Sequence, residues 1–228
     1  MPTTLRFDGR PLEAVLFDWD GTLADSHGSL FAANAAVMRA FRLPFDEDLY
    51  RRHYAADWRV MYERLGLRAD QIHEANQLWE AAYDGIETTE LFPGAAEAIE
   101  RLGRLGIPMG LVTAGPSPIV GPQVARLGLA DLLPIRVYGD DLFEQKPDPA
   151  PLRLAIARLG IDGHPSTVAY IGDAPDDMRM ARAIGAHGIG VPSRLSDRRQ
   201  LLEAGAEDVV GSVAEWVSRA LLETPAGR

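Results

Sequence analysis

The chain has no cysteine, a single lysine and no long apolar run. The lack of cysteine excludes disulfide bonds, thiolate metal sites and a cysteine nucleophile, and it suits a reducing compartment. No apolar run approaches the roughly 18 residues that a membrane span needs, and residues 1–10 lack the apolar region of a signal peptide. We therefore expect a cytoplasmic protein with no membrane partner.

Positive charge is also scarce: the sequence has 23 Lys and Arg residues and 33 Asp and Glu residues, which gives a net charge of −10. Such a surface repels nucleic acid, so we expect no nucleic-acid partner and only a local site for any anion. The 228 residues are 46% hydrophobic and 25% charged, as in an ordinary globular protein of one or two domains. The sequence has no Walker A loop, no G-x-G-x-x-G and no G-x-S-x-G, which leaves nucleotide-hydrolase, dinucleotide-cofactor and serine-hydrolase functions unsupported.

Short apolar runs bounded by turn residues alternate along the chain with segments of helical periodicity. Such runs are typical of strands buried on both faces of a sheet. We expect strands at residues 14–17, 110–112, 135–138, 168–171, 188–191 and 208–210. Their alternation with helices predicts an α/β fold with a doubly wound parallel sheet, a Rossmann-like core with helices on both faces.

One long stretch breaks this alternation. Between about residues 28 and 91 we find only helical stripes, with breaks at Pro44, Gly66 and Gly85. We predict that residues 25–91 form a helical cap domain inserted after the first strand. The catalytic core would then consist of residues 1–24 and 92–228.

Two aspartates follow the first predicted strand. Asp18 and Asp20 are two residues apart, so in extended backbone they share a face and Trp19 points to the other one. Ligands bind at the carboxyl ends of strands in an open parallel sheet, where two carboxylates repel each other unless a cation or a shared proton relieves them. The alternative explanation for these residues is structural: Asp20 and Gly21 would only form the turn that ends the strand.

Two later strands also end in polar residues. Thr113 follows one of them and can donate to an anionic oxygen, although a turn or cap role is more common for such a threonine. Asp173, Asp176 and Asp177 follow another strand and precede a helix. One acid here could merely cap the helix, but three at one strand end indicate a cation, and carboxylates suit a hard ion such as Mg²⁺.

The single lysine, Lys146, is the last of these features. In a chain whose other basic residues are all arginine, a lysine marks a place that needs a compact ammonium group. Pro147 and Pro149 restrain the backbone beside it and exclude helix there, while a new helix begins immediately afterwards. We expect Lys146 to be held rigidly at the edge of the sheet, with an ordinary surface lysine as the alternative.

All four features lie at the carboxyl edge of the predicted sheet and together complement a phosphate ester bound through a divalent ion. Their order is Asp-x-Asp-Gly-Thr, a strand ending in Thr, Lys-Pro-Asp-Pro and Gly-Asp-x-x-x-Asp. Over about residues 12–192 the chain resembles the haloacid dehalogenase-like superfamily, and its inserted helical segment resembles the cap of the phosphoglycolate phosphatase-like subgroup. This resemblance implies a Mg²⁺-dependent phosphoric monoester hydrolase.

The resemblance also implies a role for each motif residue. Asp18 is expected to be the nucleophile that forms an aspartyl-phosphate, and Asp20 the general acid and then the general base. Asp18, Asp173 and the backbone carbonyl of Asp20 are expected to bind Mg²⁺, and Asp177 to hold a metal-bound water or Lys146. The substrate phosphoryl group is expected to contact Thr113, Ala114 and Lys146.

Two positions refine this comparison. An acid at Asp20 argues against dehalogenation, because the superfamily's dehalogenases lack one there. Many relatives have Asn after the hydroxyl residue of the second motif, whereas Ala114 and Gly115 follow Thr113 here. This departure weakens the expected network around the nucleophile unless backbone amides compensate. Asp176 is an additional acid without a settled role.

The cap contains no comparable motif. Most of its Arg and His residues are expected on solvated helix faces. For side chains that face the substrate we favour His53, Asp57 and Arg59, in the break before the second cap helix, with His27 as a further candidate. The segment 73–77 is not a zinc motif, because Gln77 stands where a second His would be needed.

We therefore expect a phosphatase for a small phosphorylated metabolite, such as a phosphoglycolate-like compound, a sugar phosphate or a nucleotide, acting as a monomer or dimer. A phosphomutase of a sugar phosphate is the first alternative, and it would need a cap that holds a bisphosphate in two orientations. A non-catalytic phosphoacceptor or phospho-ligand sensor is the second. Receiver modules of that kind are much shorter and have no use for a general acid two residues beyond the acceptor.

Overall fold

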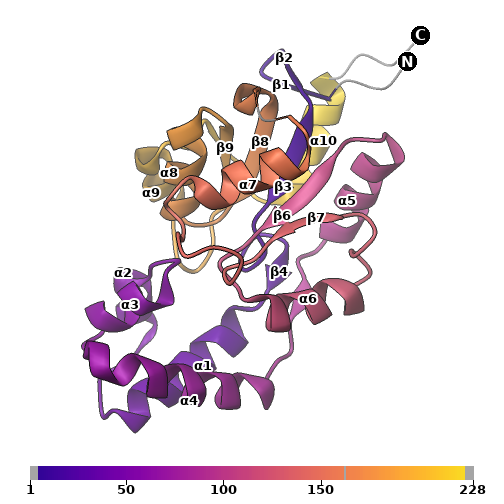
Figure 1. Cartoon of the computed structure of the whole chain (residues 1–228). Coiled ribbons are helices and arrows are strands. Elements are labelled where there is room, and N and C mark those ends of the chain that lie inside the picture. The colour runs from indigo at the N-terminus through magenta and orange to yellow at the C-terminus, as the bar shows by residue number, and fades with distance from the viewer. Residues whose placement is uncertain (1–4, 162, 224–228) are drawn as a thin grey trace.

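The structure, a computed structural model, describes residues 5–161 and 163–223. At its centre lies a six-stranded sheet in the order β10-β9-β8-β3-β6-β7, with every neighbouring pair parallel (Figure 1). The strands are β3 (Ala14–Phe17), β6 (Met109–Val112), β7 (Ile135–Val137), β8 (Val168–Gly172), β9 (His187–Gly190) and β10 (Asp208–Val209). Each lies within one residue of its predicted position at both ends. The predicted α/β class with a parallel sheet is confirmed.

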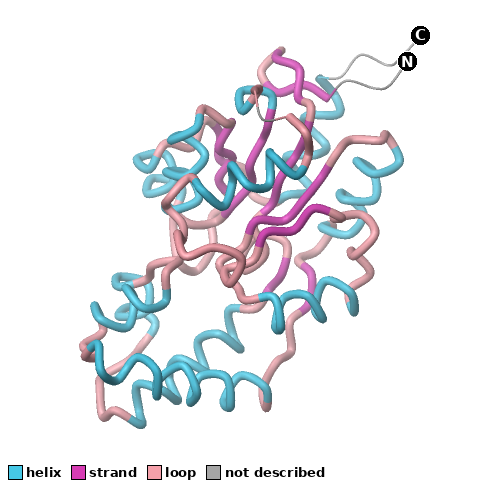
Figure 2. Tube along the Cα trace, viewed as in Figure 1, coloured by secondary structure: helices cyan, strands magenta, loops and turns pink. Residues whose placement is uncertain are grey.

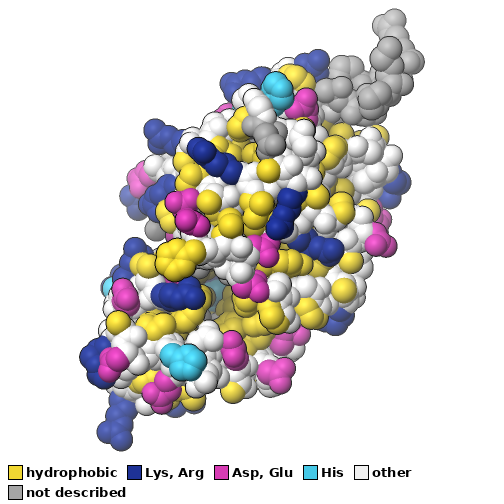
Figure 3. Space-filling view, viewed as in Figure 1, with side chains coloured by type: hydrophobic (Ala, Val, Ile, Leu, Met, Phe, Trp, Pro, Cys, Tyr) yellow, Lys and Arg dark blue, Asp and Glu magenta, His cyan; other side chains and the backbone are white. Residues whose placement is uncertain are grey.

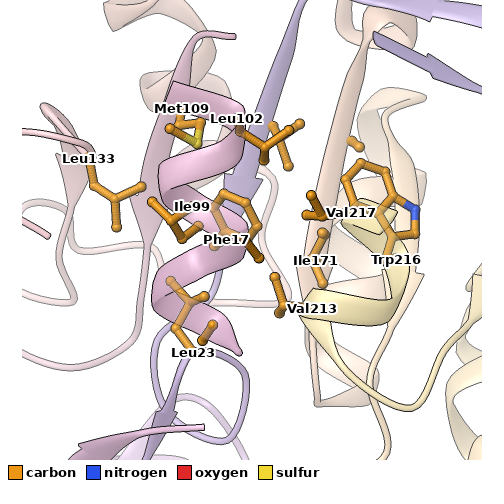
Figure 4. Packing of buried hydrophobic residues seen from close by; sticks show 14 of the residues in the cluster. Phe17, Leu23, Ile99, Leu102, Met109, Leu133, Ile171, Val213, Trp216 and Val217 are labelled. Carbon is orange, nitrogen blue, oxygen red and sulfur yellow. The ribbon is translucent and has the colours of Figure 1, made fainter. Parts of the chain in front are cut away.

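Alternating side chains of β3 face two separate hydrophobic cores. Phe17 packs with α5 (Ala95–Arg104) and α10 (Val213–Glu223), as Figure 4 shows, while Leu16 faces α7 (Ala150–Arg158) and α8 (Pro175–Ile184). α6 (Ser117–Arg126) adds to the first core, and α9 (Arg198–Ala204) packs beside β10. Helices thus cover both faces, which is why the central strands are apolar throughout.

The sequence of α5 illustrates how these helices are specified. Ala95, Ala98, Ile99 and Leu102 are buried at the spacing of one helix face, so the helix packs on the sheet along this apolar stripe. Basic residues in the last turn complement the negative end of the helix dipole. Burial of Ile99 and Leu102 contributes about 1.5–3 kcal/mol for each side chain.

A second layer contains only helices and has its own core. It consists of α1 (His27–Ala40), α2 (Glu47–His53), α3 (Trp58–Arg64), the short 3-10 turn η1 (Ala69–Gln71) and α4 (Ile72–Asp84). Figure 1 shows this layer beyond the carboxyl edge of the sheet, in the segment expected to form the cap. Val37, Met38, Met61 and Tyr62 are buried within it, apart from the two cores of the sheet.

Both connections to the helical layer run through one small ribbon. β4 (Ala24–Asp25) pairs antiparallel with β5 (Glu90–Leu91), and the Phe92 backbone N–H donates to the Leu23 carbonyl at 2.9 Å. Figure 2 shows these two strands between the helical layer and the sheet. The outgoing and returning chains are therefore tied to each other where they leave the core.

Several short elements were not predicted from the sequence. β1 (Leu5–Phe7) and β2 (Arg10–Leu12) form a hairpin whose turn, Asp8-Gly9, has positive φ at both residues, a known hairpin signal. The helix α6 contains Pro122, which obscured its periodicity. The other unpredicted elements are the β4–β5 ribbon, α2, α9, η1 and the 3-10 turn η2 (Pro165–Thr167). Across the described part of the chain, none of the helices has the length and apolarity required to cross a bilayer.

Candidate active site

The ends of three parallel strands and the segment before α7 meet around one ammonium group. Lys146 Nζ lies 2.6 Å from Asp18 Oδ1 and 2.8 Å from Asp177 Oδ1, although these residues are far apart in the chain. Beside them is a small cavity of about 20 Å³. Its lining comprises Asp18, Asp20, Tyr54, Ala56, Thr113, Ala114, Lys146, Ala174 and Asp177. All four sequence motifs thus reach one cavity, and Lys146 supplies its positive charge.

Lys146 is only 4% exposed, which rules out an ordinary surface lysine. Burial lowers the pKa of its ammonium group, but the carboxylates of Asp177 and Asp18 outweigh this effect and leave the pKa above its ordinary 10.5. The ammonium group therefore stays charged and fixed between two acids.

Asp18 follows β3 directly and is buried. The pKa of Asp18 is raised from 3.8 to about 7, mainly by burial of the carboxyl group. The positive charge of Lys146 lowers this pKa, and the negative charge of Asp177 raises it further. Thr22 donates from Oγ1 to Asp18 Oδ2 at 3.3 Å. Trp19 points into the core as strand alternation predicts, where its Nε1 donates to Gln123 Oε1 at 2.8 Å.

Asp20 reaches the same cavity from the next turn. Ser26, at the start of α1, donates from Oγ to Asp20 Oδ1 at 2.5 Å. Burial raises the pKa of Asp20, and the Ser26 hydrogen bond and the Lys146 charge only partly offset this effect. A carboxyl group with a raised pKa beside a cavity suits proton donation and removal. Ser26 was not singled out from the sequence, because nothing in its spacing marks it.

Three buried carboxylates form a cluster that fits a cation. Asp18, Asp173 and Asp177 offer oxygens within 4.8 Å of one another. Asp173 Oδ2 is buried without a hydrogen-bond partner, and the pKa of Asp173 is raised by burial and then by Asp18 and Asp177. One ammonium does not neutralise three buried carboxylates, so a divalent ion such as Mg²⁺ fits this donor set. A Cβ at Gly21 would lie 2.2 Å from Asp173 Oδ2, which explains the glycine there.

Asp176 and Asp177 are adjacent but point to different places. Asp177 faces inward, where it pairs with Lys146 and accepts from the Tyr170 hydroxyl at 3.0 Å. Asp176 accepts from the Ala56 backbone N–H at 3.3 Å and pairs with Arg179 at 2.8 Å. Asp176 thus joins the sheet layer to the helical layer.

At the second motif, the surroundings of Gly115 and Gly139 leave no room for a side chain. The Thr113 N–H donates to the Val137 carbonyl at 2.9 Å, and Thr113 Oγ1 accepts from the Gly115 N–H at 3.0 Å. A Cβ at Gly139 would lie 2.0 Å from the Ala114 carbonyl oxygen. A Cβ at Gly115 would likewise lie 2.5 Å from Val120 Cγ2, whereas Ala114 itself lines the small cavity.

A second cavity, of about 140 Å³, extends from Asp20 and Ala114 into the helical layer. Tyr54 and Ala56 of that layer line both cavities. Sequence reasoning missed them, and the only available signal was the density of aromatic residues between positions 50 and 62.

The residues of the helical layer that the sequence favoured are not among those lining these two cavities. Arg59 and His53 are not among the residues that line the two described cavities, and the guanidinium of Arg59 stacks 4.6 Å from the centre of the Trp58 ring. Asp57 caps α3 by accepting from the Arg59 N–H at 3.0 Å. His27 Nε2 lies 3.0 Å from the Glu47 carboxylate. These contacts account for Arg59, Asp57 and His27 without a ligand.

Comparisons with known proteins agree with this geometry. Residues 12–185 match the haloacid dehalogenase-like hydrolase family. A phosphoglycolate phosphatase from Yersinia pseudotuberculosis is 32% identical over 191 residues, which cover 80% of this chain and 82% of that protein.

Two solved structures extend the similarity to the fold. A proposed haloacid dehalogenase-like hydrolase from Bacteroides fragilis has a TM-score of 0.83 and 26% identity, covering 90% of this chain and 99% of that one. A proposed β-phosphoglucomutase from Thermotoga maritima has a TM-score of 0.68 and 28% identity, covering 93% and 99%. The similarity therefore spans both the sheet layer and the helical layer.

Proposed function

Because the chain belongs to the haloacid dehalogenase-like hydrolase family, we propose that it is a Mg²⁺-dependent phosphatase that hydrolyses a small phosphomonoester through an aspartyl-phosphate. The observation that carries this proposal is the contact of Lys146 Nζ with Asp18 Oδ1, beside the carboxylate cluster of Asp18, Asp173 and Asp177. The phosphatase names of the curated relatives support the same reaction.

In the proposed reaction an Asp18 oxygen attacks phosphorus, and the bond from phosphorus to the leaving oxygen breaks. Asp20 gives its proton to that oxygen, and the product alcohol departs. Asp20 then takes a proton from water, which attacks the aspartyl-phosphate and releases phosphate and Asp18. Splitting the reaction into two displacements replaces one difficult step with two easier ones, and the raised pKa of Asp20 suits both proton transfers.

The surrounding groups would bind charge rather than react. Lys146 and Thr113 would contact the phosphoryl oxygens, with backbone amides near Ala114 as further donors. Asp18, Asp173, Asp177 and the backbone carbonyl of Asp20 are the proposed Mg²⁺ ligands, Asp177 directly or through water. Bound Mg²⁺ supplies positive charge that stabilises the charge developing on the transferring group.

We also assign residues 25–91 to a cap domain that closes over this site. The support is the separate hydrophobic core of α1–α4 and the presence of Tyr54 and Ala56 at the cavity beside Asp18. A cap of this kind excludes water during transfer and contacts the leaving group.

The test is a phosphate-release assay over small phosphomonoesters, with Mg²⁺ and with chelator. We expect turnover only with the metal, and Asp18→Asn should lower kcat by about 10³-fold or more. The matched control is Asp8→Asn, since Asp8 is 77% exposed in the β1–β2 turn, distant in the fold from the site. Equal rates in chelator would remove the metal role, and substantial activity in Asp18→Asn would remove the nucleophile.

A phosphomutase is the second candidate, and the similarity to the Thermotoga maritima structure supports it. The two activities separate in one assay with a sugar phosphate. Isomerised sugar phosphate without net phosphate release would favour the mutase, whereas stoichiometric phosphate release supports the phosphatase.

A further inference from the structure

The larger cavity is continuous with the reaction site. Asp20, Tyr54, Ala56 and Ala114 line both the 140 Å³ cavity and the small cavity beside Lys146. Because Asp20 is the proposed acid for the leaving oxygen, the larger cavity is where the rest of the leaving group would lie. The residues that line it therefore indicate the chemistry of the part of the substrate that is attached to the phosphate.

No cationic side chain is among the described residues that line this cavity. Its two charged lining residues are the acids Asp20 and Glu80. Arg59 is not among these lining residues: its guanidinium stacks on the Trp58 ring, and its side chain is 56% exposed beside Asp57. A carboxylate placed in the cavity would lose hydration without gaining a positive partner, and the Glu80 carboxylate would repel it.

The lining is instead dominated by aromatic rings: Tyr50, Tyr54, Trp58, Tyr62 and Trp79. Two of the polar groups in the lining have partners within it. The Tyr62 hydroxyl donates to Asn34 Oδ1 at 2.9 Å, and Asn76 donates to Glu80 Oε1 at 2.7 Å. Figure 3 shows hydrophobic side chains gathered between the helical layer and the sheet layer.

The size of the cavity suits a ring-sized occupant. An apolar cavity of about 150 Å³ accommodates a benzene ring, and this one has about 140 Å³. Rings and flat apolar groups gain from offset or edge contacts with aromatic side chains.

We infer, resting on the proposed phosphatase function, that the leaving group is an uncharged, ring-sized apolar alcohol. The preferred substrate is then a neutral-tailed monophosphate rather than a phosphorylated carboxylic acid such as phosphoglycolate. The preferred substrate of this chain would then differ from phosphoglycolate, the compound in the name of its curated relatives.

The test compares benzyl phosphate with 4-carboxybenzyl phosphate, in the presence of Mg²⁺. The remote carboxylate hardly alters the reactivity of the leaving oxygen, so the pair isolates the charge of the tail. We expect kcat/KM for benzyl phosphate to be higher by about tenfold or more. Phosphoglycolate and its neutral analogue 2-hydroxyethyl phosphate form a second pair, with the neutral member again preferred.

A charge reversal in the lining provides the matched variant. Glu80→Lys should shift the ratio of the two kcat/KM values toward 4-carboxybenzyl phosphate by about three- to fivefold. Glu74→Lys is the control, because Glu74 is exposed on the same helix but does not line the cavity. Its ratio should match that of the wild type.

The outcomes distinguish this inference from the function on which it rests. Hydrolysis of 4-carboxybenzyl phosphate or phosphoglycolate at the same or a higher kcat/KM than the neutral partner would overturn the inference and leave the phosphatase intact. Loss of activity toward the carboxylated substrate in Arg59→Gln would overturn it as well, because Arg59 would then bind the carboxylate. No phosphate release from any of the four compounds would count against the phosphatase itself.

Discussion

At Lys146 the choice of residue type follows from the space around it. Its ammonium group lies within 2.8 Å of two carboxylates and 5.5 Å from the centre of the Tyr170 ring. The Tyr170 hydroxyl is itself fixed by the Val112 carbonyl at 2.9 Å. A guanidinium group is planar and larger than an ammonium group, so it could not take the position of Nζ without displacing these neighbours.

The variant Lys146→Arg should therefore lose activity although it keeps the charge. We expect kcat/KM to fall by about 10²-fold, because a displacement of about 1 Å at the reacting groups costs that much. The measurement is steady-state phosphate release by folded protein, verified by circular dichroism. Arg104→Lys makes the reverse exchange on the 66% exposed side chain of α5 and should retain wild-type rates. A fully active Lys146→Arg enzyme would contradict this explanation.

Residues at the strand ends were predictable, whereas those in the cap were not. Asp18, Thr113 and Asp173 each follow an apolar run. Parallel strands bring the positions after such runs to one edge of the sheet, independently of the conformation of the connecting loops. The position of Tyr54 depends on how α2 and α3 pack over that edge. No periodicity in the sequence encodes that packing, so the charged residues chosen there, His53 and Arg59, were selected by chemistry alone.

At the scale of elements, α8 is joined to the helical layer by Asp176. Its carboxylate accepts from the Ala56 N–H, in the loop between α2 and α3 that also lines the cavity. Removing this acid should loosen the loop without disturbing Asp177, which has separate partners.

We expect Asp176→Ala to raise the hydrogen-exchange rate of the Ala56 amide and to raise KM by about two- to tenfold, since a hydrogen bond to a charged group contributes about 0.5–3 kcal/mol. Hydrogen–deuterium exchange and steady-state kinetics measure the two effects. Arg179→Gln is the control, because it removes the 2.8 Å ion pair and keeps the Ala56 contact. Unchanged protection at Ala56 in Asp176→Ala would show that this contact does not hold the loop.

For the whole molecule, the buried acids link stability to pH. Burial raises the pKa of Asp18 from 3.8 to about 7 and also raises the pKa of Asp173 and Asp20. At a pH between the ordinary pKa of a carboxyl group and the raised pKa in the folded protein, the folded protein keeps protons on these acids that the unfolded chain has released. The free energy of unfolding of the metal-free protein therefore decreases as the pH rises from about 4 through about 7.

In chelator, the Tm should fall between pH 5 and pH 8 by on the order of 5 °C. Mg²⁺ should restore most of this loss at pH 8, because it binds the ionised acids of the folded state only. Thermal unfolding followed by circular dichroism measures both effects, and Asp173→Asn should show a smaller fall. A Tm that rises over this range without metal would contradict the assigned pKa directions.

The β4–β5 ribbon sets the kind of movement open to the helical layer. Sliding of β4 along β5 would require the pairing between the two strands to break. Tilting about the ribbon breaks no such pairing. If the helical layer moves as the proposed cap, this pairing limits it to tilting as one unit about the ribbon, which would return Tyr54 and Ala56 to the same position beside Asp18 at each closure.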